Sequence, residues 1–413
     1  MRRACFIATV AILASISWLS STLAQAGGPG PPELYFYPPP YKLPNGSLSP
    51  SILTVAPEQI TDLFPSVKEM DGVVLLVAWN QLCPRANSCD FSLIDRVLNY
   101  WGPRGKKVIL SLSTMGLPVK VMVDGRERFL EETPEWVLRE VRTYPAHSPT
   151  IGVIAGMDVS EGSSHIDTAF PSHLDERFLS HVSHAVQQLA SKYDGNPVIS
   201  YVRVGTGSLG EDNPIPPSGA GLLADQKIPG FTVANWLSYC ERVTSIYLDA
   251  FHRSQLEFDI SFLPAAYGRI ATPGERMAIE KFIRFLGDKR VFIAFNGLES
   301  ADLEYLHATS GPAPVHALNF LRNSKQSGNR IGLEEVSPIV NPRMQNVSAM
   351  AETVKSLGAD RIVLFGIDAG AINFARSGSN PTNASTVQFV TAQGKSADAV
   401  GHLVEDLLHR VGY

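Results

Sequence analysis

Two pairs of adjacent carboxylates stand out in this sequence, because each occurs where an apolar, strand-like run ends. Glu211 and Asp212 follow such a run and a glycine-rich turn, GTGSLG, and Glu334 and Glu335 lie within a second run, Arg330–Val336. A carboxyl group at the end of a strand can give or accept a proton, or attack an electrophilic carbon. Two facing carboxyl groups can divide these tasks between them.

These carboxylates belong to a regular alternation of predicted strands and helices that begins near Asp71. The apolar runs predicted as strands are Gly72–Trp79, Lys107–Ser113, roughly Glu135–Leu138, Val198–Gly205, Phe258–Leu263, Arg290–Asn296, Arg330–Val336 and Arg361–Asp368. Amphipathic segments between them, such as Phe91–Leu98 and Phe178–Leu189, predict helices. Eight units of this kind favour an α/β fold, a (β/α)8 TIM barrel, over a doubly wound sheet. One carboxylate pair then follows the fourth strand and the other lies on the seventh.

Residues 114–175 interrupt this alternation, because they are polar and only weakly periodic. We interpret them as a long loop insertion around strand three. Insertions of this length are usually functional, and we expect this one to lie over the open face of the barrel.

In a TIM barrel the active site lies at the carboxyl ends of the strands. Besides the carboxylates, the polar and aromatic residues predicted there are Trp79, Asn80, Trp136, Arg203, Tyr267, Asn296 and Asp368. Aromatic faces pack on sugar rings, and amides bind sugar hydroxyls. Two carboxyl groups over such a groove predict cleavage of a glycosidic bond, in which one protonates the leaving oxygen and the other attacks the anomeric carbon or activates water.

The segments DGVVLLVAWNQL, CDFSLIDRVLNYWGPRGKKVILSLS, TPEWVL and YVRVGTGSLGE occur in this order. Their order resembles that of the (β/α)8 retaining glycoside hydrolases of the large clan that includes the β-galactosidase and cellulase families. The resemblance covers most of the chain after about residue 56. It implies an acid/base at Glu211 and a nucleophile at Glu334 or Glu335. The clan usually has Asn before its acid/base, whereas this chain has Gly210, which suggests a divergent member or one without activity.

The orientation of the seventh strand decides between Glu334 and Glu335. Side chains alternate along a strand, so Glu335 points inward if Ile331 and Leu333 do, and Glu334 points inward if Gly332 does. The clan has an apolar residue two positions before its nucleophile, and Leu333 matches it, which favours Glu335.

Arg203 and the histidines each allow two interpretations. Arg203 alternates with Tyr201, so it either points into the barrel and pairs with a catalytic carboxylate or points outward to a helix end. His181 and His184 have helical i, i+3 spacing, which suits a metal site but is also common on solvated faces. Without a motif such as HExxH, no metal and no cofactor are expected.

The start of the chain predicts export. Residues 1–26 have a basic start, an apolar stretch and small residues near Ala26, as in a secretory signal peptide, so a secreted or periplasmic location is expected. Residues 27–56 are rich in Pro and Gly and are interpreted as an extended lead-in to a barrel domain over 57–413. An oxidising compartment makes a disulfide between Cys83 and Cys89 expected.

The balance of charge limits the partners. The net charge of the 413 residues is −5, without a long basic run, so we expect no nucleic-acid partner and no membrane association after signal cleavage. The leading hypothesis is a secreted glycoside hydrolase acting on an oligo- or polysaccharide, with a carbohydrate as its partner. The alternatives are a non-catalytic glycan-binding protein on the same barrel and a metal-dependent hydrolase that uses the histidines.

Overall fold

The structure is a computed structural model of the whole chain. It describes residues 30–42, 48–49, 52–62, 64, 67–86, 88–115, 119–123, 126–130, 132–149, 165–212, 231–260, 272–298 and 312–413. The predicted signal peptide over 1–26 lies outside these residues, so export stays a prediction.

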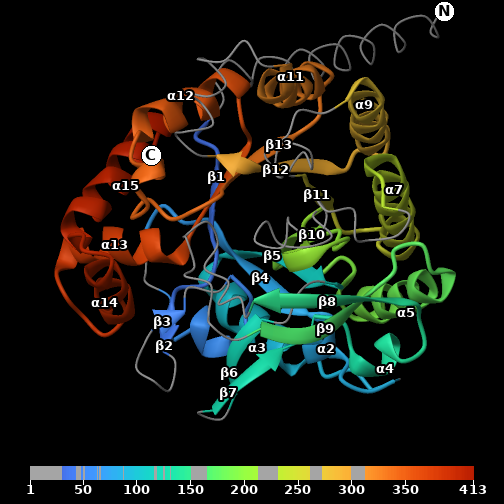
Figure 1. Cartoon of the computed structure of the whole chain (residues 1–413). Coiled ribbons are helices and arrows are strands. Elements are labelled where there is room, and N and C mark those ends of the chain that lie inside the picture. Colours follow the sequence, from blue (N-terminus) through green and yellow to red (C-terminus); the bar gives the residue numbers. More distant parts are fainter. Residues whose placement is uncertain are drawn as a thin grey trace, which may run out of the picture.

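Eight parallel strands form a closed barrel at the centre of the molecule (Figure 1). In chain order they are β1 (Glu33–Phe36), β4 (Gly72–Ala78), β5 (Lys107–Ser113), β10 (Ile199–Arg203), β11 (Leu256–Ile260), β12 (Phe292–Leu298), β13 (Ile331–Glu335) and β14 (Arg361–Leu364). Their order around the barrel follows the chain, and β1 pairs with both β4 and β14, which closes the sheet. The predicted TIM barrel is therefore confirmed.

One barrel strand was not predicted, and one of the eight predicted strands is wrong. The first barrel strand is β1, which lies inside the segment 27–56 predicted as a lead-in, so the barrel begins earlier than residue 57. Prolines on both sides of this four-residue run hid its strand character. Conversely, Glu135–Leu138, predicted as the third strand, forms the short helix α4. The two errors offset each other in the count, so β10 is the fourth strand and β13 the seventh.

Helices surround the barrel (Figure 1). They are α2 (Trp79–Leu82), α3 (Ser92–Trp101), α5 (Glu176–Tyr193), α7 (Val233–Ala250), α9 (Pro273–Asp288), α11 (Pro312–Gln326), α12 (Val347–Leu357), α13 (Gly366–Ser377), α14 (Ala384–Ala392) and α15 (Ala397–Val411). Local sequence fixes several starts: the Asp175 side chain accepts the Arg177 amide, and Thr272 and Glu275 form a capping box. Within the described part of the chain, no helix is long and apolar enough to cross a membrane.

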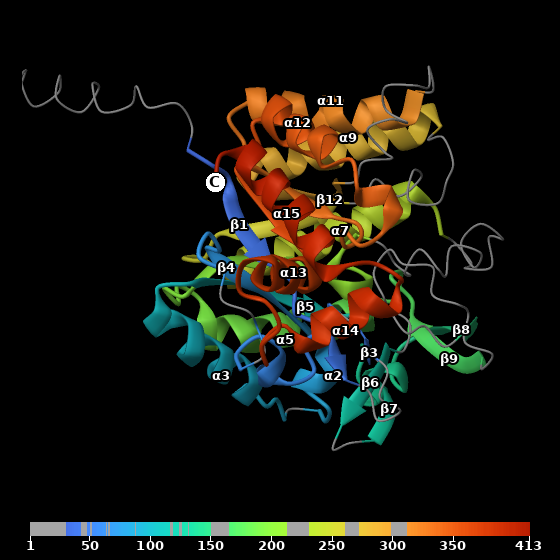
Figure 2. The same cartoon turned by 90° about the vertical axis from the view of Figure 1, so that its left-hand side faces the viewer.

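The predicted insertion follows β5, the third strand, and its described residues include two hairpins. β6 (Val119–Val123) pairs with β7 (Arg126–Leu130), and β8 (Thr143–Pro149) pairs with β9 (His165–Pro171), both antiparallel. Figure 2 shows the two hairpins at one end of the barrel, on the side away from the C-terminus. A third, shorter hairpin joins β2 (Tyr41–Lys42) to β3 (Leu48–Ser49). Short 3-10 turns occur at Pro57–Gln59 (η1), Gly102–Arg104 (η2), Ser208–Gly210 (η3) and Pro342–Met344 (η5).

The hydrophobic core has two layers. The larger layer lies between the barrel and its helices and includes Val73, Leu75 and Val77 of β4. The smaller layer fills the barrel and includes Val74 and Leu76 of the same strand, as strand alternation requires. The division into these two layers decides which side chains of the other strands can reach the lumen.

Cys83 and Cys89 form the predicted disulfide, with an S–S distance of 2.03 Å.

Candidate active site

Arg203 extends into the barrel from the end of β10 and is fully buried. Its Nε donates to Glu257 Oε1 at 2.8 Å and its Nη1 donates to Asp259 Oδ2 at 3.1 Å, both on the adjacent strand β11. It also forms an ion pair with Glu334 of β13. Strands β11 and β12 separate β10 from β13 in the sheet, so this contact runs across the lumen. Of the two orientations predicted for Arg203, the inward one is therefore correct.

Glu334 is the carboxylate of the seventh strand that points into the lumen. Besides Arg203, it accepts a hydrogen bond from Arg361 Nη2 at 3.3 Å and one from the Tyr37 hydroxyl at 2.5 Å. A Cβ added at Gly332, two positions earlier, would lie within 3.1 Å of the Phe292 and Arg361 side chains inside the barrel. The alternation of the strand thus places Gly332 and Glu334 on the inner face.

The buried cluster contains two guanidinium groups and three carboxyl groups, and it is neutral when one carboxyl group is protonated. Although burial alone would raise it, the charges of Arg361 and Arg203 hold the pKa of Glu257 below its usual value. Burial and the neighbouring charge of Glu334 raise the pKa of Asp259 well above its usual range. Of these two carboxyl groups Asp259 is therefore the one that favours a proton, and its protonation would avoid an uncompensated buried charge.

Glu211 lies on a tight turn after β10. Within this turn Leu209 and Gly210 have φ angles of 56° and 76°, in the left-handed region. A Cβ at Gly210 would lie 2.3 Å from Ser111 Oγ, so this backbone excludes the Asn that the resembled clan has here. Asn296 of β12 instead supplies an amide, because its Nδ2 donates to Glu211 Oε1 at 2.7 Å.

Glu211 reaches the strand beside Glu334, because Asn296, its hydrogen-bond donor on β12, is the register partner of Glu334 on β13. Burial raises the pKa of Tyr37 well above its usual range, and the negative charges of Glu334, Asp259 and Glu211 add to the shift. The charges of Glu334 and Glu211 likewise contribute to the raised pKa of Asp259. The charges of both carboxylates therefore act on Tyr37 and Asp259, and Glu334 also contacts Tyr37 directly.

Glu335 points to the outer layer, so the preference for it as the inward carboxylate was wrong. Ile331 and Leu333, on the same side of β13, belong to the core between barrel and helices. Glu335 Oε2 accepts the Phe365 amide at 3.0 Å, and burial together with Asp368 raises the pKa of Glu335 well above its usual range. An apolar residue two positions before a Glu could not reveal the orientation, because apolar residues fill both layers of this barrel.

Asp368 is paired with Glu335 and does not face the lumen, which corrects its prediction as a substrate-binding residue. Its Oδ1 accepts the Ile339 amide at 3.0 Å, and burial raises its pKa to about 7. Among the described residues, Glu335 Oε1 and Asp368 Oδ2 have no other hydrogen-bond donor, as expected when two carboxyl groups share a proton. The pair joins the end of β13 to the start of α13.

This pair predicts a pH-dependent stability. Both pKa values are raised on folding, so the folded protein binds more protons than the unfolded chain between about pH 4 and 7. The contribution of this pair to the free energy of unfolding is therefore fully present below this window and is lost as the pH rises through it. Urea titrations at pH 5 and 8 should show a fall of roughly 2 kcal/mol in the free energy of unfolding.

A Glu335→Gln substitution should reduce this slope, because its amide can donate to an ionised Asp368. The exposed Glu352 on α12 gives the control substitution, Glu352→Gln, which should keep the wild-type slope. Equal slopes in wild type and the Glu335→Gln variant would show that the pair does not share a proton.

The two predicted aromatic platforms lie in the outer core. Trp79 is buried on α2 and meets Trp136 of α4 edge to face, with ring centroids 6.0 Å apart. Trp79 also packs on Phe178 of α5, and Trp136 Nε1 donates to the Cys83 carbonyl at 3.0 Å. These contacts give both tryptophans packing roles in place of the predicted sugar-binding role.

Of the two remaining predicted residues, Asn80 lies within the described part of the chain and Tyr267 does not. Asn80, on α2, is half-buried, and its backbone amide donates to the Glu132 carbonyl at 2.9 Å. Tyr267 lies outside the described residues, so its role stays a prediction.

Sequence reasoning missed five polar residues that build this site: Tyr37, Glu132, Glu257, Asp259 and Arg361. A signal was present for two of them, because charged and apolar residues alternate in the segment LEFDI of β11. That alternation is typical of a strand with one polar face. It was overlooked because buried parallel strands usually lack polar residues.

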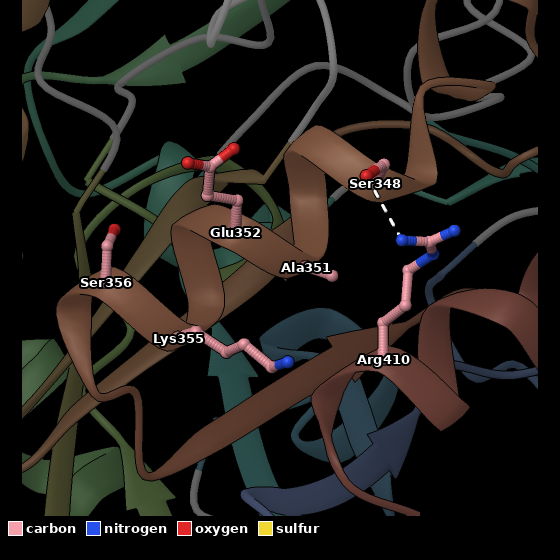
Figure 3. A pocket seen from close by; sticks show the side chains of 6 residues that line it. All are labelled: Ser348, Ala351, Glu352, Lys355, Ser356 and Arg410. Carbon is pink, nitrogen blue, oxygen red and sulfur yellow. Dashed lines mark hydrogen bonds between the residues drawn. The ribbon is translucent and has the colours of Figure 1, made fainter.

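Two further observations bear on the kind of site. Among the described residues, no three or more His, Cys, Asp or Glu side chains are arranged so that they could hold a metal ion. A hollow of about 450 Å³ lies on helices α12 and α15, where Arg410 Nη1 donates to Ser348 Oγ at 3.3 Å (Figure 3). It belongs to the outer helices and contains none of the lumen residues.

Several solved structures resemble this chain at low sequence identity. No known protein family and no curated protein sequence matches it. Solved structures that it resembles include a GH10 xylanase from Thermobacillus composti, with 12% identity and a TM-score of 0.38 over 72% of this chain and 77% of the xylanase. Another is the β-galactosidase from the psychrophilic Marinomonas ef1, with 11% identity and a TM-score of 0.40 over 81% of this chain and 57% of the galactosidase.

A third is the xylanase XynB from Paenibacillus barcinonensis, with 14% identity and a TM-score of 0.36 over 73% of this chain and 78% of the xylanase. These proteins, two xylanases and a β-galactosidase, are glycoside hydrolases like those that the sequence resembles. Similarities at this level carry no argument about activity. The closed sheet itself establishes the fold.

Proposed function

We propose that this protein hydrolyses glycosidic bonds of an oligo- or polysaccharide, with Glu211 as acid/base and Glu334 as nucleophile. The observation that carries the proposal is that Asn296, the hydrogen-bond donor of Glu211 after strand four, is the register partner of Glu334 on strand seven. Carboxyl groups on opposite sides of one site at the carboxyl ends of barrel strands suit the attack and the protonation that cleavage requires.

The different surroundings of the two carboxylates support this division of roles. Glu334 accepts hydrogen bonds from Arg203, Arg361 and Tyr37, as an ionised carboxylate does, and the guanidinium charges compensate its own. Glu211 accepts an amide donor from Asn296 and is less deeply buried. In the proposed reaction Glu334 attacks the anomeric carbon while Glu211 protonates the leaving oxygen. Glu211 then takes a proton from the water that releases the sugar.

Incubation of the purified protein with a panel of β- and α-linked glycans tests the proposal. We expect reducing ends to be released from at least one of them, and NMR of the first product should show the anomeric configuration of the substrate retained. An inverted product would keep hydrolysis but make Glu334 a base that activates water. Binding of a glycan without release, measured in parallel by calorimetry, would rule out the enzyme.

Binding without cleavage is the second candidate function. It is favoured by the complete burial of Glu334 and by the three donors that occupy it, which suit a structural charge as well as a nucleophile. The same panel decides between the two functions, because release and binding are measured on the same glycans.

A further inference from the structure

A carboxylate from the insertion holds the turn that carries Glu211. Glu132 lies between β7 and α4, and its side chain is fully buried. Its Oε2 accepts hydrogen bonds from the backbone amide of Leu209, at 3.1 Å, and from the Ser113 hydroxyl. Its Oε1 accepts from the Ser208 hydroxyl at 3.4 Å. Three donors from β5 and from the turn therefore converge on one side chain.

Ser113, at the end of β5, extends this contact to the next residue of the turn. Its Oγ accepts the backbone amide of Gly210 at 3.1 Å. Glu132 and Ser113 thus bind the amides of Leu209 and Gly210, which are the residues of this turn that have left-handed φ angles. A leucine in this conformation is unfavourable, and such strain persists only where surrounding contacts hold it.

The backbone around Glu132 is itself anchored to the barrel. The Asn80 amide, just after β4, donates to the Glu132 carbonyl at 2.9 Å. The Thr133 hydroxyl donates to the Thr114 carbonyl, just after β5, at 2.8 Å. The carboxylate is therefore fixed relative to two barrel strands, and it can transmit that position to the turn.

We propose that Glu132 is a positioning residue that holds the turn at Leu209 and Gly210 and thereby sets the position of Glu211. It acts through backbone amides and does not contact the substrate. The inference rests on the proposed function for its effect on catalysis, whereas its effect on the turn is independent of any reaction. An insertion outside the regular barrel would then supply part of the active-site architecture.

A Glu132→Ala substitution should loosen the turn. Loss of a charged acceptor should increase hydrogen exchange at the Leu209 and Gly210 amides by about ten- to a hundredfold. On the glycan from which the wild type releases most reducing ends, kcat should fall by about 10²-fold with KM nearly unchanged, because a misplaced catalytic group slows chemistry more than binding.

A Glu132→Gln substitution separates positioning from direct chemistry. Its carbonyl oxygen can still accept the Leu209 amide, and its NH2 group can donate to the Ser208 hydroxyl, so most of the kcat should return. Loss of kcat as severe as in Glu132→Ala would overturn the proposal, because a positioning contact does not require ionisation. If Glu132→Ala fails to fold, Ser113→Ala should show the same changes in exchange and kcat to a smaller degree.

Glu140→Ala is the matched control, because Glu140 lies in the same insertion but is exposed and pairs with His181. It should leave the exchange of Leu209 and the kcat as in the wild type. If the wild type cleaves no glycan, the proposed function fails, while the exchange measurement still decides whether Glu132 holds the turn. If the wild type is active and Glu132→Ala changes neither exchange nor kcat, the proposal on Glu132 is wrong.

Discussion

A Glu334→Gln substitution should lower kcat by at least about 10⁴-fold, because removing a catalytic nucleophile abolishes the covalent step. The amide is isosteric with the carboxylate, so its oxygen can still accept from Arg203 and Arg361 while its NH2 group donates to the Tyr37 oxygen. It cannot form the glycosyl intermediate. Steady-state rates on the preferred glycan give the measurement, and KM or direct binding should change much less than kcat.

The folded state of this variant should survive, because the buried cluster can rebalance its charge. The charge of Glu334 is one reason why the pKa of Asp259 is raised, after burial itself. When that charge is removed, Asp259 can ionise and restore two negative groups against Arg203 and Arg361. An intact fold by circular dichroism, together with the loss of kcat, would therefore assign the loss to chemistry.

The neighbouring Glu335→Gln substitution is the matched control. It changes the same group one residue further along, on the outer face of β13, and should keep kcat within about threefold. A large loss of kcat in Glu335→Gln and a small one in Glu334→Gln would contradict the assignment. It would favour the orientation that the apolar residue at Leu333 originally suggested.

The barrel could be predicted from the sequence because its strongest signals are local. Seven apolar runs and the helices between them were recognised from hydrophobic periodicity. β1 was missed because four residues between prolines carry too little periodicity. Its neighbours in the closed sheet, β14 and β4, are far away in the sequence, so its pairing has no local signal.

The proposed catalytic pair could be predicted only in part. Glu211 and the two candidates on β13 were found because they end predicted strands. The cluster around Glu334 was missed because its contacts join residues far apart in sequence, such as Tyr37 and Arg203. The tryptophans were misassigned because the sequence does not say whether an aromatic residue after a strand turns toward the lumen or toward the helices.

An Arg203→Met substitution should lower the free energy of unfolding by about 3–5 kcal/mol, because it removes one partner of a buried ion-pair network. Methionine fills most of the volume but leaves Glu334 with Arg361 as its remaining guanidinium partner and Asp259 without its Arg contact. Urea unfolding at pH 7 gives the measurement. The control is Arg242→Met, which removes an exposed pair with Glu176 and should change stability little.

The pH dependence of this loss tests its electrostatic origin. With one guanidinium left for three carboxyl groups, neutrality requires a second proton, so folding should raise the pKa of another carboxyl group in the cluster. The loss in free energy of unfolding caused by Arg203→Met should therefore be larger at pH 8 than at pH 5. The double variant Arg203→Met/Glu334→Gln should be more stable than Arg203→Met alone, because it no longer buries that uncompensated carboxylate. Equal deficits at both pH values would instead indicate lost packing, and Arg203 would then contribute volume rather than charge to the lumen.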